Sequence, residues 1–183
     1  IQEVLKIAGA DARDITDISI ARDAKANLNA KLAFIAKNPW VGFNVAKTRL
    51  SLHREAKDTG SEMAEALGFD PVERKINFHS VEHHLAHIAS AYFCSGYERA
   101  TGVSVDGAGD FCTVMIARCE GNQIKVLKRC HPPHSLGVYD TALCGFLGFT
   151  RYGEEYKVMG MAAYGQDRYA EQFKDVVRWD PKK

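Results

Sequence analysis

Two neighbouring stretches decide the fold: His83-His84-Leu85-Ala86-His87, and then Val103-Ser104-Val105-Asp106-Gly107-Ala108-Gly109. A spacing of four residues is about one helical turn, so His83 and His87 share a helix face, and His84 points about 100° away. The second stretch predicts a β-branched strand that ends in a carboxylate and a glycine turn. Two imidazoles and one carboxylate suit Fe(II), Zn(II) or Mn(II). We therefore expect His83, His87 and Asp106 to hold a divalent metal. The alternative is a solvent-facing helix surface, or a buried histidine bonded to a backbone carbonyl.

The composition indicates a globular domain. The 183 residues are 46% hydrophobic, and 24 basic against 23 acidic residues give a formal net charge of +1. This balance of charges argues against a nucleic-acid binder or a membrane-surface protein. The sequence contains no run of about 18 apolar residues, so we expect no membrane span. Residues 1–6 lack the basic and apolar regions of a signal peptide, and the odd number of cysteines without a CxxC pair favours a cytoplasmic protein. Residues 1–6 read as the middle of a helix, without a starting Met, so we expect a fragment of a longer chain.

The five cysteines form no CxxC pair, which predicts reduced thiols, mostly packed as small buried side chains.

The predicted elements alternate between helices and strands. We expect helices at 2–8, 24–36, 45–67, 80–94 and 135–146, and strands at 15–21, 75–79, 100–106, 111–118 and 124–130. Residues 120–123 predict a hairpin turn, and Ser80 is expected to cap the histidine-bearing helix. Adjacent antiparallel strands exclude a simple doubly wound parallel sheet. The fold class is therefore α/β, with a mixed sheet and helices.

Two segments with glycines are candidates for holding a phosphate. Gly107 lets a phosphate approach the backbone amides, and Ser135 and Gly137 stand at the start of a predicted helix. A plain tight turn and ordinary helix capping by Ser135 are the respective alternatives. The chain contains neither a P-loop nor a dinucleotide fingerprint.

A third segment, residues 153–165, is dense in charged residues, tyrosines and glycines. Lys157 is suited to neutralise a phosphate, and Glu155 to orient it or to act as a base. A surface turn with salt bridges is the alternative from composition alone.

Taken together, these motifs resemble one family, the O-carbamoyltransferases of the nodulation, cephamycin and tobramycin type. The resemblance rests on residues 83–92, 105–109, 133–137 and 153–160, in that order, and covers roughly residues 75–165. It implies an N-terminal domain with the actin and sugar-kinase (ribonuclease H-like) superfold. Residues 1–183 would be an incomplete part of that domain, and the C-terminal YrdC-like domain of the family is absent from this chain.

The resemblance also implies an activity. The YrdC-like part makes carbamoyl adenylate from carbamoyl phosphate and ATP, and the N-terminal part transfers the carbamoyl group to a hydroxyl of a sugar or natural product. An Fe(II)-type metal would be held by His83, His87 and Asp106, with a further ligand outside this chain. The expected roles are catalytic for Asp106 and Lys157, and adenylate-binding for Asp106, Gly107, Ser135 and Gly137. The fragment alone is expected to be inactive, and its oligomeric state stays open.

Other functions fit the same residues. A tRNA threonylcarbamoyl-transfer protein of the same superfold shares the histidine spacing, but the near-neutral charge argues against a tRNA partner. A non-catalytic nucleotide-binding module would bind nucleotide without needing a metal. A zincin-type hydrolase is excluded because His84, and not a glutamate, follows His83.

Overall fold

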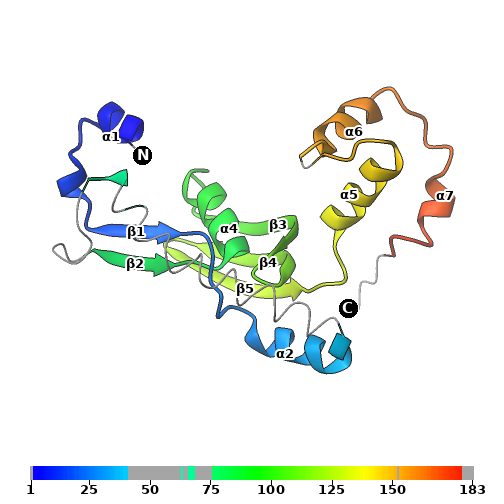
Figure 1. The fold of residues 1–183 in the computed structure, drawn as a ribbon, viewed down its shortest axis with the longest axis horizontal. Coiled ribbons are helices and arrows are strands. Elements are labelled where there is room, and N and C mark those ends of the chain that lie inside the picture. The colour runs from blue at the N-terminus through cyan, green and yellow to red at the C-terminus, as the bar shows by residue number, and fades with distance from the viewer. Residues whose placement is uncertain (1, 41–62, 64–65, 69–75, 152, 179–183) are drawn as a thin grey trace. The chain divides into compact units, whose positions relative to one another are not determined.

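The computed structural model describes residues 2–40, 63, 66–68, 76–151 and 153–178 (Figure 1). The chain divides into two compact units, Ile1–Gly137 and Val138–Lys183. The elements in chain order are α1 (Gln2–Ala8), a 3-10 helix η1 (Ala12–Asp14), β1 (Asp17–Ile20), α2 (Leu28–Lys37), β2 (Asn77–Ser80), α4 (His83–Phe93), β3 (Arg99–Gly109), β4 (Cys112–Glu120), β5 (Gln123–Cys130), α5 (Leu136–Phe146), α6 (Glu155–Ala162) and α7 (Ala170–Phe173).

The described strands form two sheets, both in the first unit. β1 and β2 pair in parallel, with Ile18 opposite Phe78. β3, β4 and β5 form an antiparallel sheet in that order. The predicted hairpin is confirmed, because Glu120 pairs with Gln123 and Gly121 adopts a φ of 57°. The mixed α/β class is also confirmed. Parallel and antiparallel pairing, however, lie in separate sheets in the described part of the chain, not in one mixed sheet.

Helix α4 packs on one face of the antiparallel sheet and forms the core with it. The buried apolar residues of this cluster are Ile88, Tyr92, Cys112, Met115, Ala117 and Cys119. The β4 members Met115, Ala117 and Cys119 follow the two-residue period of a strand with one buried face. At Gly102 of β3, an added Cβ would lie 2.5 Å from the Cγ2 atom of Ile88. The close approach of α4 to the sheet therefore depends on a glycine.

Two predictions about where helices begin differ from the structure. Ser80 does not cap α4, because it is the last residue of β2 and pairs with Ile20. Glu82 is the N-cap instead, and its Oε2 accepts a hydrogen bond from the Leu85 amide at 2.8 Å. Helix α2 begins at Leu28 and not at 24, because Asn27 adopts a left-handed φ of 56°. Residues 155–162, for which composition alone left a surface turn as the alternative, form a helix. Most of the helix predicted at 45–67 lies outside the described residues.

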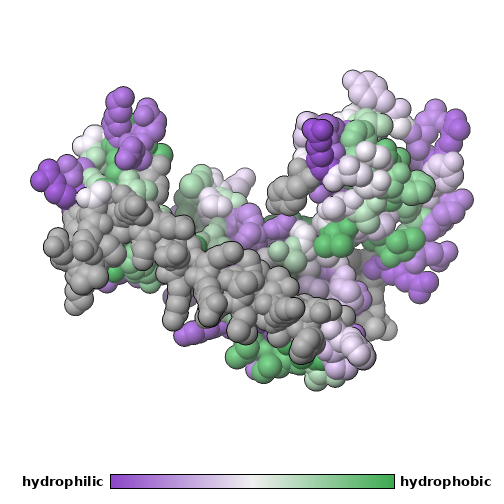
Figure 2. Space-filling model, in the orientation of Figure 1, coloured by the Kyte–Doolittle hydropathy of each residue, from purple (hydrophilic) through white to green (hydrophobic). Residues whose placement is uncertain are grey.

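Helix α2 exposes an apolar stripe and is fixed to the β3–β4 turn on another side. Leu28, Leu32 and Ile35 are exposed, and Figure 2 shows apolar residues gathered over this helix. The Phe34 ring meets the Phe111 ring edge to face, with centroids 5.5 Å apart. This contact brings the start of β4 to the helix that follows β1.

The five cysteines are unpaired, as predicted, and Cys112, Cys119 and Cys144 are buried. Among the described helices, none has both the length and the apolar character needed to span a bilayer.

Candidate metal centre

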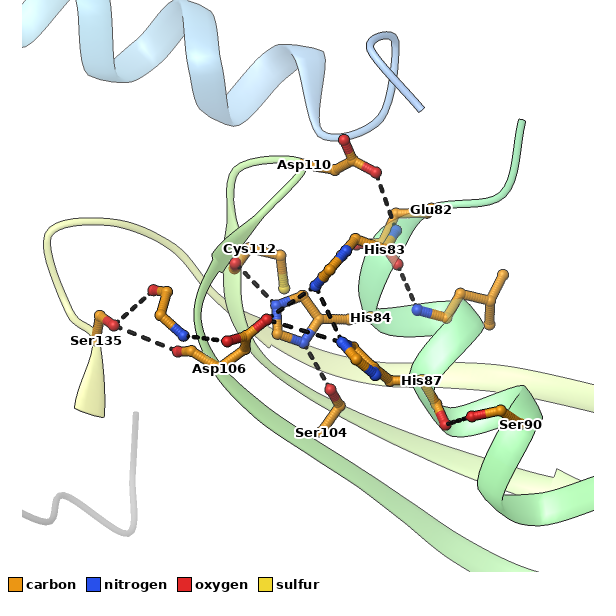
Figure 3. Close-up of polar contacts among 12 residues, drawn as sticks. Glu82, His83, His84, His87, Ser90, Ser104, Asp106, Asp110, Cys112 and Ser135 are labelled. Atoms are coloured by element: carbon orange, nitrogen blue, oxygen red, sulfur yellow. Dashed lines mark hydrogen bonds and ion pairs between the residues drawn. The ribbon is translucent and has the colours of Figure 1, made fainter. Parts of the chain in front are cut away.

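Three polar side chains from two elements converge beside the core. The first turn of α4 supplies His83, the next turn supplies His87, and the end of β3 supplies Asp106 (Figure 3). The Nε2 atom of His83 lies 2.8 Å from Asp106 Oδ2 and 3.0 Å from His87 Nε2. His87 Nε2 lies 3.8 Å from Asp106 Oδ2. One possible ligand atom from each of the three residues therefore lies close to the other two. We call His83, His87 and Asp106 the metal group.

The metal group fits a divalent ion in both donor chemistry and spacing. A tetrahedral ion with ligand bonds of about 2.0–2.1 Å holds its ligand atoms roughly 3.4 Å apart. The three separations, 2.8, 3.0 and 3.8 Å, bracket that value. The side chains are 30%, 54% and 43% exposed for His83, His87 and Asp106, so solvent and a ligand can reach them. Three protein ligands leave a position open for a substrate.

The Asp106 carboxylate is stabilised in its charged form. Its hydrogen bond with His83 lowers the pKa of Asp106, and the Gly107 amide, which donates to Oδ1 at 2.6 Å, lowers it further against the opposing effect of burial. A metal ligand must be deprotonated, so a low carboxyl pKa favours metal binding.

The position of His83 depends on a glycine in the strand that carries Asp106. An added Cβ at Gly109 would lie 2.7 Å from the Cβ atom of His83, and closer still to the ring atoms Cγ and Cδ2. No side chain fits there while the imidazole keeps its place. Gly107, two residues earlier, has open space at the corresponding point. Of these two glycines, only Gly109 is required by the metal group itself.

His84 lies off the face shared by His83 and His87, as the helical spacing predicted, and it is a structural histidine. It is fully buried, and its ring nitrogens lie 2.8 Å from Ser104 Oγ and 2.9 Å from the Cys112 carbonyl oxygen. A carbonyl only accepts, so Nε2 donates to Cys112, and the Ser104 hydroxyl is the hydrogen-bond partner of Nδ1. His84 therefore joins α4 to both β3 and β4 and fixes the helix that carries His83 and His87.

Burial keeps the nearby thiol of Cys112 out of nucleophilic chemistry. Burial first, and then the charge of Glu82, raise the pKa of Cys112 to about 11. The thiol donates to the Val114 carbonyl at 3.2 Å. A thiol with so high a pKa supplies almost no thiolate at neutral pH.

The structure brings three of the predicted phosphate-binding residues together beside Asp106. The Ser135 hydroxyl donates to the Gly107 carbonyl at 2.6 Å, with the Asp106 carbonyl at 3.3 Å. An added Cβ at Gly137 would lie 2.5 Å from the Gly107 nitrogen. The Gly107 amide itself donates to Asp106, as described above. The phosphate-binding role of Gly107, Ser135 and Gly137 stays a prediction.

Lys157 belongs to the second unit. Its ammonium donates to Glu154 Oε1 at 2.6 Å and lies 5.6 Å from the centroid of the Phe149 ring. The hydrogen bond with Glu154 raises the pKa of Lys157, so the group stays charged. Glu155 accepts from the Thr141 hydroxyl at 2.8 Å. The catalytic role of Lys157 stays a prediction.

Two acidic residues that fix the start of α4 were not predicted from the sequence. Glu82 accepts from Leu85, and Asp110 Oδ2 accepts from the His83 amide at 2.9 Å. An acidic residue just before a helical run is a usable signal for a cap, because carboxylates are favoured at helix N-termini. No local signal marks Asp110, which lies 27 residues from its partner.

Comparison with known proteins agrees with the motifs. Residues 7–178 match the family described as carbamoyltransferase N-terminus. The chain is 32% identical over 166 residues to nodulation protein NolNO of Sinorhizobium fredii, which covers 90% of this chain and 23% of that protein. It is 38% identical over 94 residues to nodulation protein NolO of Bradyrhizobium diazoefficiens, covering 51% of this chain and 17% of that protein. An uncharacterised Synechocystis protein gives the same identity over the same length, with 15% of its own length covered. The chain thus spans less than a quarter of these relatives.

Proposed function

Because the chain belongs to the carbamoyltransferase N-terminus family, as its motifs predicted, we propose that it is part of an enzyme that moves a carbamoyl group from carbamoyl adenylate to a hydroxyl of a sugar or natural product. The adenylate would be made from carbamoyl phosphate and ATP by a YrdC-like domain outside this chain. Residues 1–183 would then be a fragment of the N-terminal domain, with the actin and sugar-kinase superfold.

The observation that carries the proposal is the convergence of His83, His87 and Asp106. These residues would hold Fe(II), which supplies Lewis acidity to an oxygen of the carbamoyl or phosphate group when bound. The ionised Asp106 offsets the charge of the ion, and the partial exposure of all three side chains leaves room for the donor.

The adenylate would lie next to the metal group. The Ser135–Gly137 segment packs directly on the backbone of Asp106 and Gly107, so an anion held at the start of α5 would be beside Asp106. Backbone amides near Gly107 and Gly137 would steady the phosphate as the acceptor hydroxyl attacks the carbamoyl carbon and AMP leaves. Lys157 would neutralise phosphate charge, for which it would have to leave Glu154.

The test uses the full-length enzyme and compares His87→Ala with His79→Ala. His79 is an exposed histidine that pairs with Asp17 across β1 and β2, outside the metal group, so it controls for loss of a histidine as such. We expect His87→Ala to lose bound metal and at least about 100-fold in transfer, since loss of a ligand affects both. The control should keep both.

Two outcomes would contradict the proposal. Wild-type transfer by His87→Ala would show that the metal group is not used. The second outcome is a wild-type protein that binds nucleotide but does not transfer a carbamoyl group, and whose nucleotide binding does not change when metal is removed. This result would favour the non-catalytic nucleotide-binding module.

A further inference from the structure

Asp110, at the turn between β3 and β4, joins three segments that are distant in the sequence. Its Oδ2 atom accepts from the backbone amides of His83, at 2.9 Å, and Asp23, at 2.7 Å. Its backbone carbonyl accepts from Asn27 Nδ2 at 3.0 Å. One residue therefore holds the start of α4, the loop after β1 and the start of α2 against the β3–β4 turn. Figure 3 shows the first of these contacts, from Asp110 to the His83 amide.

The bond to His83 is the one that concerns the metal group. The amides of the first helical turn have no partner within the helix, and a carboxylate is the strongest acceptor for them because it also meets the positive end of the helix dipole. Asp110 stands only four residues after Asp106. One short turn thus carries a metal ligand and also the anchor of the helix that carries the other two.

Asp110 does not belong to the metal group. The Oδ2 atom takes both amide hydrogens, and the carboxylate atoms that meet His83 and His87 come from Asp106. The contact between Asp110 and this group of side chains is therefore made through the backbone amide of His83.

We infer that Asp110 is a positioning residue for the metal group: its carboxylate fixes the His83 end of α4 at the distance from Asp106 that metal binding needs. The inference rests on the proposed metal function of His83, His87 and Asp106. It assigns to Asp110 no contact with metal or substrate.

The test is Co(II) titration of the full-length protein, followed by visible absorption, for wild type, Asp110→Asn and Asp110→Ala. An asparagine keeps an oxygen that can accept both amides but lacks the charge, whereas alanine removes the acceptor. Substitutions of residues that orient metal ligands cost about 10–100-fold in affinity. We expect a loss in that range for Asp110→Ala, with an altered Co(II) spectrum, and a smaller loss for Asp110→Asn.

Asp17→Ala is the matched control, because Asp17 is an exposed carboxylate bonded to His79 outside the metal group. It should bind Co(II) with wild-type affinity and spectrum. If Asp110→Ala does not fold, Asp110→Asn decides on its own, and an affinity and spectrum equal to wild type would overturn the inference.

A purely structural role would lower the unfolding temperature of both Asp110 variants without changing the Co(II) spectrum of the folded protein, and this result also overturns the inference. If the wild-type protein takes up no Co(II), the metal group itself is refuted, and the positioning role falls with it. Failure of the proposed function and failure of the positioning role therefore give different results.

Discussion

An alanine at Gly109 would test whether the strand that carries Asp106 is shaped around His83. The added Cβ would lie 2.7 Å from the Cβ of His83 and closer still to two of its ring atoms. The backbone has little freedom to retreat, because Gly109 pairs with Cys112 at the end of the β3–β4 ladder. The imidazole is therefore the part that must move.

The size of the effect follows from contact distances. Carbon atoms pack at about 3.5–4.0 Å, so the ring must withdraw by roughly 1 Å or more. A hydrogen bond does not survive such a shift, and the 2.8 Å contact between His83 Nε2 and Asp106 Oδ2 would open. Overpacking of this kind costs about 1–3 kcal/mol. If the cost falls on the metal-bound state, affinity drops about 5- to 150-fold, since about 1.4 kcal/mol is a factor of ten.

The assay is metal titration together with thermal unfolding of the metal-free protein. Gly107→Ala is the control, because it adds the same methyl group to the same strand where no atom lies within 4 Å. We expect Gly109→Ala to lose metal affinity and Gly107→Ala to keep it. Wild-type affinity in Gly109→Ala, or an equal loss in both variants, would refute the reasoning.

Three further predictions concern stability. Ser104→Ala leaves Nδ1 of a buried imidazole without its hydroxyl partner, and urea unfolding should show a loss of about 1–3 kcal/mol; a change below about 0.5 kcal/mol would contradict this. In the metal-free chain, the low pKa of Asp106 stabilises the fold above the ordinary carboxyl value of 3.8, and this contribution is lost as the pH falls below it. The difference in unfolding free energy between wild type and Asp106→Asn should therefore shrink as the pH falls below 3.8, whereas a difference that grew over that range would oppose the assignment. Gly102→Ala puts a methyl group 2.5 Å from the core residue Ile88 and should destabilise the fold by about 1–3 kcal/mol. Gly160→Ala, which has open space inside α6, should instead stabilise the fold by about 0.5–1 kcal/mol. Calorimetry that gives both changes the same sign would argue against this packing.

The convergence of His83, His87 and Asp106 could be predicted from the sequence because its signals are local. The four-residue spacing places His83 and His87 on one helix face without any knowledge of the rest of the chain. A strand that ends in Asp106 is likewise visible in a few residues. The predicted N-cap of α4, Ser80, was wrong. The choice between Ser80 and Glu82 depends on where β2 ends, and the pairing of β2 with β1 determines that end. A neighbouring strand is not part of a local pattern.

The two glycines of the β3–β4 turn, Gly107 and Gly109, differ in a way that the sequence does not reveal. A glycine in a sequence does not show whether a side chain would fit at that position, or what it would meet. At Gly109 it would meet the imidazole of His83, whereas at Gly107 the space is open. The turn thus combines a proposed metal ligand at Asp106, a proposed phosphate contact at Gly107, room for His83 at Gly109 and an anchor for α4 at Asp110. Since alanine at 109 disturbs His83 and alanine at 107 does not, the two substitutions separate the metal function of this turn from its proposed phosphate function.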